Sequence, residues 1–116
     1  MARSTQKTAV NITIDQGSNY SEEFTVTSDG TTAVDISGMT LNGQIRKSYD
    51  STSATATFTT ALVTAASGIY RLKLTNSETA AITSGRYVFD VELTLNDSTI
   101  ERVHGGIATV TPEVTK

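Results

Sequence analysis

The strongest pattern in this sequence is a regular alternation of side chains between positions 86 and 95. The apolar members are Tyr87, Phe89, Val91, Leu93 and Leu95, and the residues between them are Arg86, Val88, Asp90, Glu92 and Thr94. Successive side chains of a strand point to opposite faces, so one face of this segment is apolar and the other is mostly polar. Gly85 opens the run and a turn at 96–98 closes it. We predict the central strand of an antiparallel sheet here, with the other strands packed against its apolar face.

Shorter alternations of the same kind occur along the rest of the chain. They predict strands at 10–14, 24–27, 39–46, 54–59, 70–75, 99–104 and 107–110. Leu62 and Val63 either extend the strand before them or begin a short piece of their own. Residues 76–82 are the one helix-like stretch, of two turns at most, with Asn76 or Ser77 as the cap. The pattern predicts an all-β, antiparallel β-sandwich of about eight short strands with one short helical turn.

Glycines inside or beside these strands mark special positions. Gly43 lies within a predicted strand, where a neighbour approaches closely or a bulge occurs. The pair Gly105–Gly106 interrupts the apolar pattern and predicts a bulge or kink. Tyr70 and Tyr87 each follow a glycine by two residues. This spacing is typical of a tyrosine corner, whose hydroxyl bonds a nearby backbone group. For Tyr87 a corner and an ordinary inward-facing aromatic are equally good interpretations, and for Tyr70 the inward-facing aromatic is preferred.

Length and composition indicate one small domain. The chain has 116 residues, of which 37% are hydrophobic, so it supports a modest two-layer core but not a large buried pocket. We predict an N-terminal arm at 1–8, a β-sandwich domain at 9–111 and a C-terminal tail at 112–116. A partner or an oligomer that covers further surface is expected to help such a chain.

Charge and residue usage argue against several classes of function. The net charge is −3 and no basic run occurs, which disfavours nucleic-acid binding. The sequence has no long apolar segment, so we expect no transmembrane helix. The N-terminus lacks the apolar core of a signal peptide. The chain has no cysteine, which excludes disulfides and thiolate metal sites. Synthesis in a cytoplasm is the expectation.

Reactive side chains do not form a recognisable catalytic pattern. His104 is the single histidine and no Gly-x-Ser-x-Gly elbow is present, so His104 is expected to be a structural or surface residue. Asp90 and Glu92 share one strand face and read best as a solvated face. The aspartates at 15, 29, 35, 50 and 97 lie in or beside turns, without the spacing of a calcium loop. We expect no enzymatic activity and no cofactor.

The order of the sequence elements resembles a known family. The matching pieces are Asn11–Gly17, Val34–Thr40, Gly43–Lys47, Gly68–Leu74, Ser77–Ile82, Gly85–Glu92 and Gly106–Thr115. Together they resemble small tailed-bacteriophage virion proteins related to the N-terminal domain of baseplate upper proteins. Met39 stands where that family commonly has an aromatic residue. The resemblance covers nearly the whole chain and implies an immunoglobulin-like β-sandwich without catalytic residues.

The resemblance also implies a role. The chain is expected to be a virion structural protein, an adaptor at the tail, baseplate, neck or fibre attachment that works by docking to other virion proteins. It is expected to form a homo-oligomer or a symmetric multi-copy assembly in the virion, after synthesis in the host bacterial cytoplasm. Two alternatives stay open: a capsid-decorating protein, and a module that binds a host-surface glycan or protein through the loops at 28–33 and 47–53.

Basic residues and one loop tyrosine are the candidates for an interface. The seven residues are Arg3, Lys7, Arg46, Tyr49, Arg71, Lys73 and Lys116. Arg46, Arg71 and Lys73 form a basic patch only if their strands are neighbours. The two polar termini are candidate clamps that become ordered on a neighbouring protein.

Overall fold

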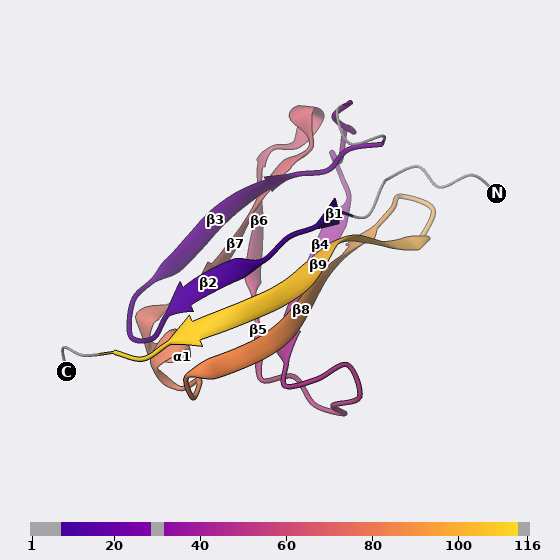
Figure 1. Ribbon diagram of the computed structural model, residues 1–116. Coiled ribbons are helices and arrows are strands. Elements are labelled where there is room, and N and C mark those ends of the chain that lie inside the picture. The colour runs from indigo at the N-terminus through magenta and orange to yellow at the C-terminus, as the bar shows by residue number, and fades with distance from the viewer. Residues whose placement is uncertain (1–7, 29–31, 114–116) are drawn as a thin grey trace.

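The chain forms two β-sheets in the computed structural model, which describes residues 8–28 and 32–113 (Figure 1). The strands are β1 (Thr8–Ala9), β2 (Ile12–Asp15), β3 (Tyr20–Thr25), β4 (Thr40–Arg46), β5 (Ala56–Thr57), β6 (Thr59–Thr64), β7 (Ile69–Leu74), β8 (Gly85–Thr94) and β9 (Ile100–Thr111). A 3-10 turn η1 (Ala65–Ser67) and a short helix α1 (Asn76–Ala80) complete the elements. One sheet has the order β1-β9-β8-β4-β5, with β2 also paired to β9, and the other has the order β3-β7-β6. The all-β prediction is confirmed.

Strand β8 lies at the centre of the larger sheet, as its alternation predicts. It pairs antiparallel with β4 on one side and with β9 on the other. Its inward side chains, Tyr87, Phe89, Val91 and Leu93, are each no more than 5% exposed. The Tyr87 hydroxyl also donates a hydrogen bond of 2.6 Å to the Thr83 carbonyl, which is the nearby backbone contact expected of a tyrosine corner.

Aromatic rings join the two sheets across the core. The ring centroid of Phe58 lies 6.0 Å from that of Tyr20 on β3 and 6.2 Å from that of Phe89 on β8. Further along, His104 of β9 lies 5.2 Å from Phe24 of β3. Ring pairs at these separations add to the energy of burial. The core therefore occupies the space between the sheets.

The predicted strand at 54–59 is wrong as a single element. Residues 56–57 pair with β4 in the larger sheet, whereas β6 pairs with β7 in the smaller sheet, so the chain changes sheets at Phe58. The Phe58 amide still donates to the Gly43 carbonyl at 2.8 Å, and a Cβ on Gly43 would lie 3.1 Å from the Phe58 ring. The close approach predicted at Gly43 is confirmed. Leu62 and Val63 belong to β6.

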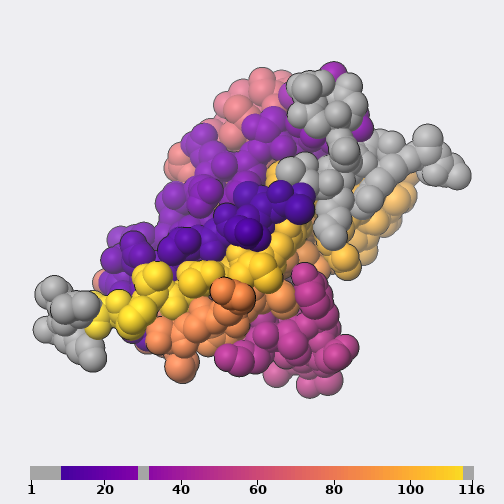
Figure 2. All heavy atoms as spheres, in the orientation of Figure 1, coloured from indigo at the N-terminus to yellow at the C-terminus, as the bar shows by residue number. Residues whose placement is uncertain are grey.

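The expectation of a purely antiparallel sheet is wrong for the first strands. Both β1 and β2 run parallel to β9 (Figure 1). Figure 2 shows β9 in yellow, with the indigo first strands along one side and orange β8 along the other. The parallel pairing is interrupted at Val10 and Asn11. There the Val10 amide donates to the Gly105 carbonyl at 2.9 Å, and the Ile107 amide donates to Asn11 Oδ1 at 3.2 Å.

The C-terminal strand also differs from the prediction. Residues 100–111 form one continuous strand, and the two glycines pair in register with Phe89 and Asp90. The bulge lies two residues earlier, because His104 opposes Val91 while Arg102 opposes Glu92. The extra residue, Val103, lets two consecutive side chains be buried, since both Val103 and His104 are nearly inaccessible.

Helix α1 is shorter than predicted and is capped by a different residue. Thr75 is the N-cap: its hydroxyl accepts from the Glu78 amide at 3.2 Å, and the Glu78 carboxylate accepts from the Thr75 amide at 2.8 Å. This reciprocal pair is a capping box. Strand pairing as a whole runs from Thr8 to Thr111, close to the predicted domain at 9–111. The predicted arm at 1–8 lies almost entirely outside the described residues, as does most of the tail at 112–116.

Replacing Gly106 by alanine tests the interrupted parallel edge. A Cβ at this position would lie 2.0 Å from the Val10 carbonyl oxygen, which is backbone and cannot rotate away. We expect Gly106→Ala to lower the free energy of unfolding by about 2 kcal/mol through overpacking. Urea unfolding measures this, with Thr109→Val on the same strand as a control expected to stay within about 0.5 kcal/mol of the unmodified chain. Equal stability of Gly106→Ala and the unmodified chain would contradict the close approach.

Candidate functional site

The predicted interface residues that the structure describes lie on different elements. Arg46 lies at the end of β4 in the larger sheet, whereas Arg71 and Lys73 lie on β7 in the smaller sheet, so their strands are not neighbours. The condition for a basic patch is therefore not met, because these residues are distributed over two different sheets. Arg3, Lys7 and Lys116 lie outside the described residues.

Arg46 organises the loop that carries Tyr49. Its Nη1 donates to the Ser51 carbonyl at 2.8 Å and its Nη2 donates to Gln44 Oε1 at 2.9 Å. Tyr49 itself is 76% exposed. Gln44, Arg46, Tyr49 and Asp90 border a hollow of about 40 Å³. Such a volume accommodates about one water molecule, which is far less than a sugar ring requires.

Arg71 and Lys73 project from the outer face of the smaller sheet. Arg71 forms an ion pair with Glu23 on the neighbouring strand β3, and both side chains are more than a third exposed. An exposed pair of this kind contributes little to stability. Lys73 borders a shallow depression of about 360 Å³ with Tyr20 and Thr59. Arg71 is thus engaged within the chain, and Lys73 is the more accessible cation of the two.

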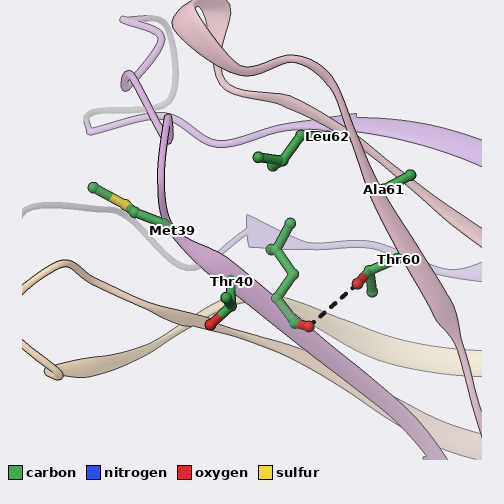
Figure 3. A pocket seen from close by; sticks show the side chains of 6 residues that line it. Met39, Thr40, Thr60, Ala61 and Leu62 are labelled. Carbon is green, nitrogen blue, oxygen red and sulfur yellow. Dashed lines mark hydrogen bonds between the residues drawn. The ribbon is translucent and has the colours of Figure 1, made fainter.

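An uncharged groove with apolar and hydroxyl side chains lies between the edges of the two sheets and was not predicted. It has a volume of about 280 Å³ and is lined by Met39, Thr40, Leu41, Thr60, Ala61 and Leu62. Figure 3 shows Leu62 reaching from β6 into the space beside β4, and the hydrogen bond from the Thr60 hydroxyl to the Leu41 carbonyl, 3.2 Å long, which links the two strands. Leu62 and Val63 are 41% and 44% exposed. This edge exposes apolar surface where a soluble strand usually carries charge.

The sequence contains a signal for this groove, although a weak one. Residues 59–64 form a run without a charged residue, proline or glycine. Short apolar and hydroxyl side chains of this kind are compatible with a buried strand as well as an exposed edge. Only the position of β6 at the margin of its sheet distinguishes the two cases.

The histidine is buried in the core and has a structural contact. Its Nδ1 lies 2.5 Å from the Tyr70 hydroxyl, so Tyr70 bonds a side chain of the facing sheet and is not a tyrosine corner. Burial lowers the pKa of His104 to about 4, and a backbone hydrogen bond to Thr25 opposes that shift. Burial also raises the pKa of Tyr70, chiefly by desolvation. The neutral pair satisfies both polar groups within the core.

The remaining ionisable residues are dispersed along strand faces and turns. Asp90 forms an ion pair of 3.3 Å with Arg102 on the adjacent strand. Hydrogen bonds from Ser37 lower the pKa of Asp35, and hydrogen bonds from Thr99 lower the pKa of Asp97, which confirms both aspartates as turn residues. Within residues 8–28 and 32–113, no three histidine or carboxylate side chains come together in a way that could hold a metal ion. No helix in these ranges is long and apolar enough to cross a bilayer.

The sequence matches no protein-family model and no curated protein. Function therefore has to be inferred from the residues and surfaces described above. Of these, the groove beside β6, the depression beside Lys73 and the exposed tyrosine loop offer accessible surface suited to recognition.

The buried histidine predicts a dependence of stability on pH. Its pKa is about 6.5 in the unfolded chain and about 4 in the folded chain, so the unfolded state binds more protons between these values. The contribution of His104 to the free energy of unfolding is fully present above pH 6.5. As the pH falls towards 4, the free energy of unfolding decreases by about 3 kcal/mol. Urea unfolding at several pH values measures the loss. The double variant Tyr70→Phe/His104→Phe keeps the carboxylates and serves as the control; an unchanged pH profile in this variant would contradict the assignment.

Proposed function

We propose that this protein is a structural component of a tailed-bacteriophage virion, an adaptor at the tail, baseplate, neck or fibre attachment. The observation that carries the proposal is the exposed, uncharged edge strand β6 beside a groove lined by apolar and hydroxyl side chains. Such an edge offers unpaired backbone groups and apolar surface to another protein. The resemblance of the sequence to small virion proteins supports the same role.

The strand order supports an immunoglobulin-like arrangement for this adaptor. The strands β9, β8 and β4 lie side by side in one sheet, and β3 and β7 pair in the other, as the G, F, C and B, E strands do in immunoglobulin-like sandwiches. The hydrogen bond of Tyr87 at the start of β8 occupies the place of a tyrosine corner. A rigid scaffold of this kind holds its edges in fixed positions, which suits repeated docking in a symmetric particle.

Docking and catalysis place different demands on a surface. A catalytic site needs ionisable groups that converge on a substrate, usually in a concave pocket. Here the one buried histidine is engaged with Tyr70 in the core, and the groove beside β6 is lined by apolar and hydroxyl side chains. The accessible features therefore favour a protein that binds other proteins.

Immunogold electron microscopy of phage particles tests the proposed role. Antibodies raised against the purified chain are expected to label intact particles at one recurrent position, because an adaptor occupies a fixed site. The position of the label also separates a tail or neck protein from a capsid-decorating protein. Particles that carry no label, with all of the protein free in the lysate, would refute the proposal; antibodies adsorbed with the purified chain provide the control.

A second candidate function is recognition of a host-surface glycan, and the exposure of Tyr49 favours it. An aromatic ring on an accessible loop can stack on a sugar face, although the adjoining hollow is small. Screening the chain on a glycan array is expected to reveal binding that Tyr49→Ala abolishes and Tyr49→Phe retains. Both variants should fold normally because the side chain is largely solvated. The absence of any bound glycan would exclude this function.

A further inference from the structure

Strand β6 differs from the β2 and β3 edges in its chemistry, and from the uncharged edges β1 and β5 in its length, since those have two residues each and β6 has six. It pairs with β7 along one side and forms the margin of the smaller sheet. The opposite margin, β3, carries Glu22 and Glu23, and the β2 edge of the larger sheet carries Asp15. Edge strands of monomeric proteins usually carry charges or proline that block pairing with another chain. Residues 59–64 contain neither.

The side chains of β6 have defined directions. Thr60 and Leu62 oppose Leu72 and Tyr70, both fully buried, and therefore point towards the inner layer. Ala61 opposes Arg71 and points to the outer face. Leu62 is nonetheless 41% exposed, because it lies at the open groove between β6 and β4.

We propose that β6 pairs antiparallel with β6 of a second copy of this chain, across a two-fold axis at Ala61. The inference rests on the proposed docking role of this edge and names its partner. The two smaller sheets would join into one continuous sheet of six strands, with the order β3-β7-β6-β6-β7-β3. An interface of this type is isologous, so the same surface serves both copies.

The proposed register follows from the alternation and the bulge. Directly opposed residues of an antiparallel pair point to the same face, so inward residues must meet inward residues. The pairing with β7 is irregular between Leu62 and Thr64, which prevents a two-fold axis at Leu62. An axis at Thr60 would leave Leu62 beyond the paired segment. With the axis at Ala61, each Leu62 opposes Thr60 of the other copy. Each Leu62 then also lies in the groove of its own chain, beside Leu41.

Electrostatics permit this pairing and disfavour self-pairing of the other margin. A pair of β3 strands would bring carboxylates of Glu22 and Glu23 against their own copies. In the proposed pair, the outward-facing cations nearest to the axis are the two Arg71 residues. They lie on the two β7 strands, which are three strand spacings, or roughly 14 Å, apart. That separation exceeds the Debye length of about 8 Å at physiological salt. Each Arg71 is also paired with Glu23 of its own chain.

Cysteine cross-linking tests the register directly, because the natural chain has no cysteine. In Ala61→Cys the two Cα atoms across the axis would lie within the range that a disulfide spans. We expect this variant to form a covalent dimer under mild oxidation, seen on a non-reducing gel. Ala66→Cys, exposed in the nearby η1 turn, is the matched control and should remain monomeric. Equal cross-linking of the two variants would overturn the proposed register.

Charge substitutions at Leu62 test the pairing without a covalent bond. The two Leu62 residues would lie about 8 Å apart across the axis, given the spacing of residues and strands. Leu62→Lys and Leu62→Glu should each weaken self-association by about tenfold or more, and their mixture should restore it as a heterodimer. Sedimentation velocity measures the association, and circular dichroism verifies that both variants fold. A natural chain that sediments as a monomer up to its solubility limit would overturn the proposal.

These results are separable from the test of the virion role. Labelled particles together with a monomeric purified chain would refute self-pairing and leave the adaptor role standing. A dimer whose Leu62 variants behave as expected, in the absence of any particle label, would support self-pairing and refute the virion role.

Discussion

The burial of one face of β8 is the constraint on which the structure depends. Tyr87, Phe89, Val91 and Leu93 point to the same side and are almost inaccessible to solvent, so β8 needs neighbours on both edges and a second sheet above it. The chain has few large apolar residues with which to meet this need, and it uses aromatic rings to span the core. Phe58, between Tyr20 and Phe89, joins the two sheets with a single side chain.

The transfer of the chain from one sheet to the other at Phe58 has a functional consequence. Because β5 is only two residues long, it pairs with β4 near the C-terminal end of that strand only. The edge of β4 near Thr40 and Leu41 has no β5 partner. On the same side of the molecule, β6 forms the margin of the smaller sheet. The groove between these strands thus arises from the same crossing that completes the core. Packing and surface chemistry are therefore coupled at this edge.

The groove beside β6 is harder to recognise in the sequence than the strands are. Charge is visible in a sequence, so basic residues stand out as candidates for an interface, yet Arg46 binds its own loop and Arg71 binds Glu23. The groove at Leu62 is built from residues that look unremarkable one by one. Its significance depends on which strand lies at the margin of a sheet, and pairing order is a long-range property that alternation does not encode. The parallel placement of β1 and β2 beside β9 was missed for the same reason.

Local pattern by itself determined that this chain is all-β and that the alternating segment, observed as Gly85–Thr94, forms the central strand, and it offered the backbone contact of Tyr87 near a corner as one of two interpretations. These features depend on side-chain alternation and on turn residues, which act over a few positions. Tertiary structure alone decided where the chain changes sheets, where the bulge in β9 falls, and that His104 is buried against Tyr70. Those outcomes depend on which distant segments compete for the same core space, and the physical reason is that burial rewards the assembled layers and not any single strand.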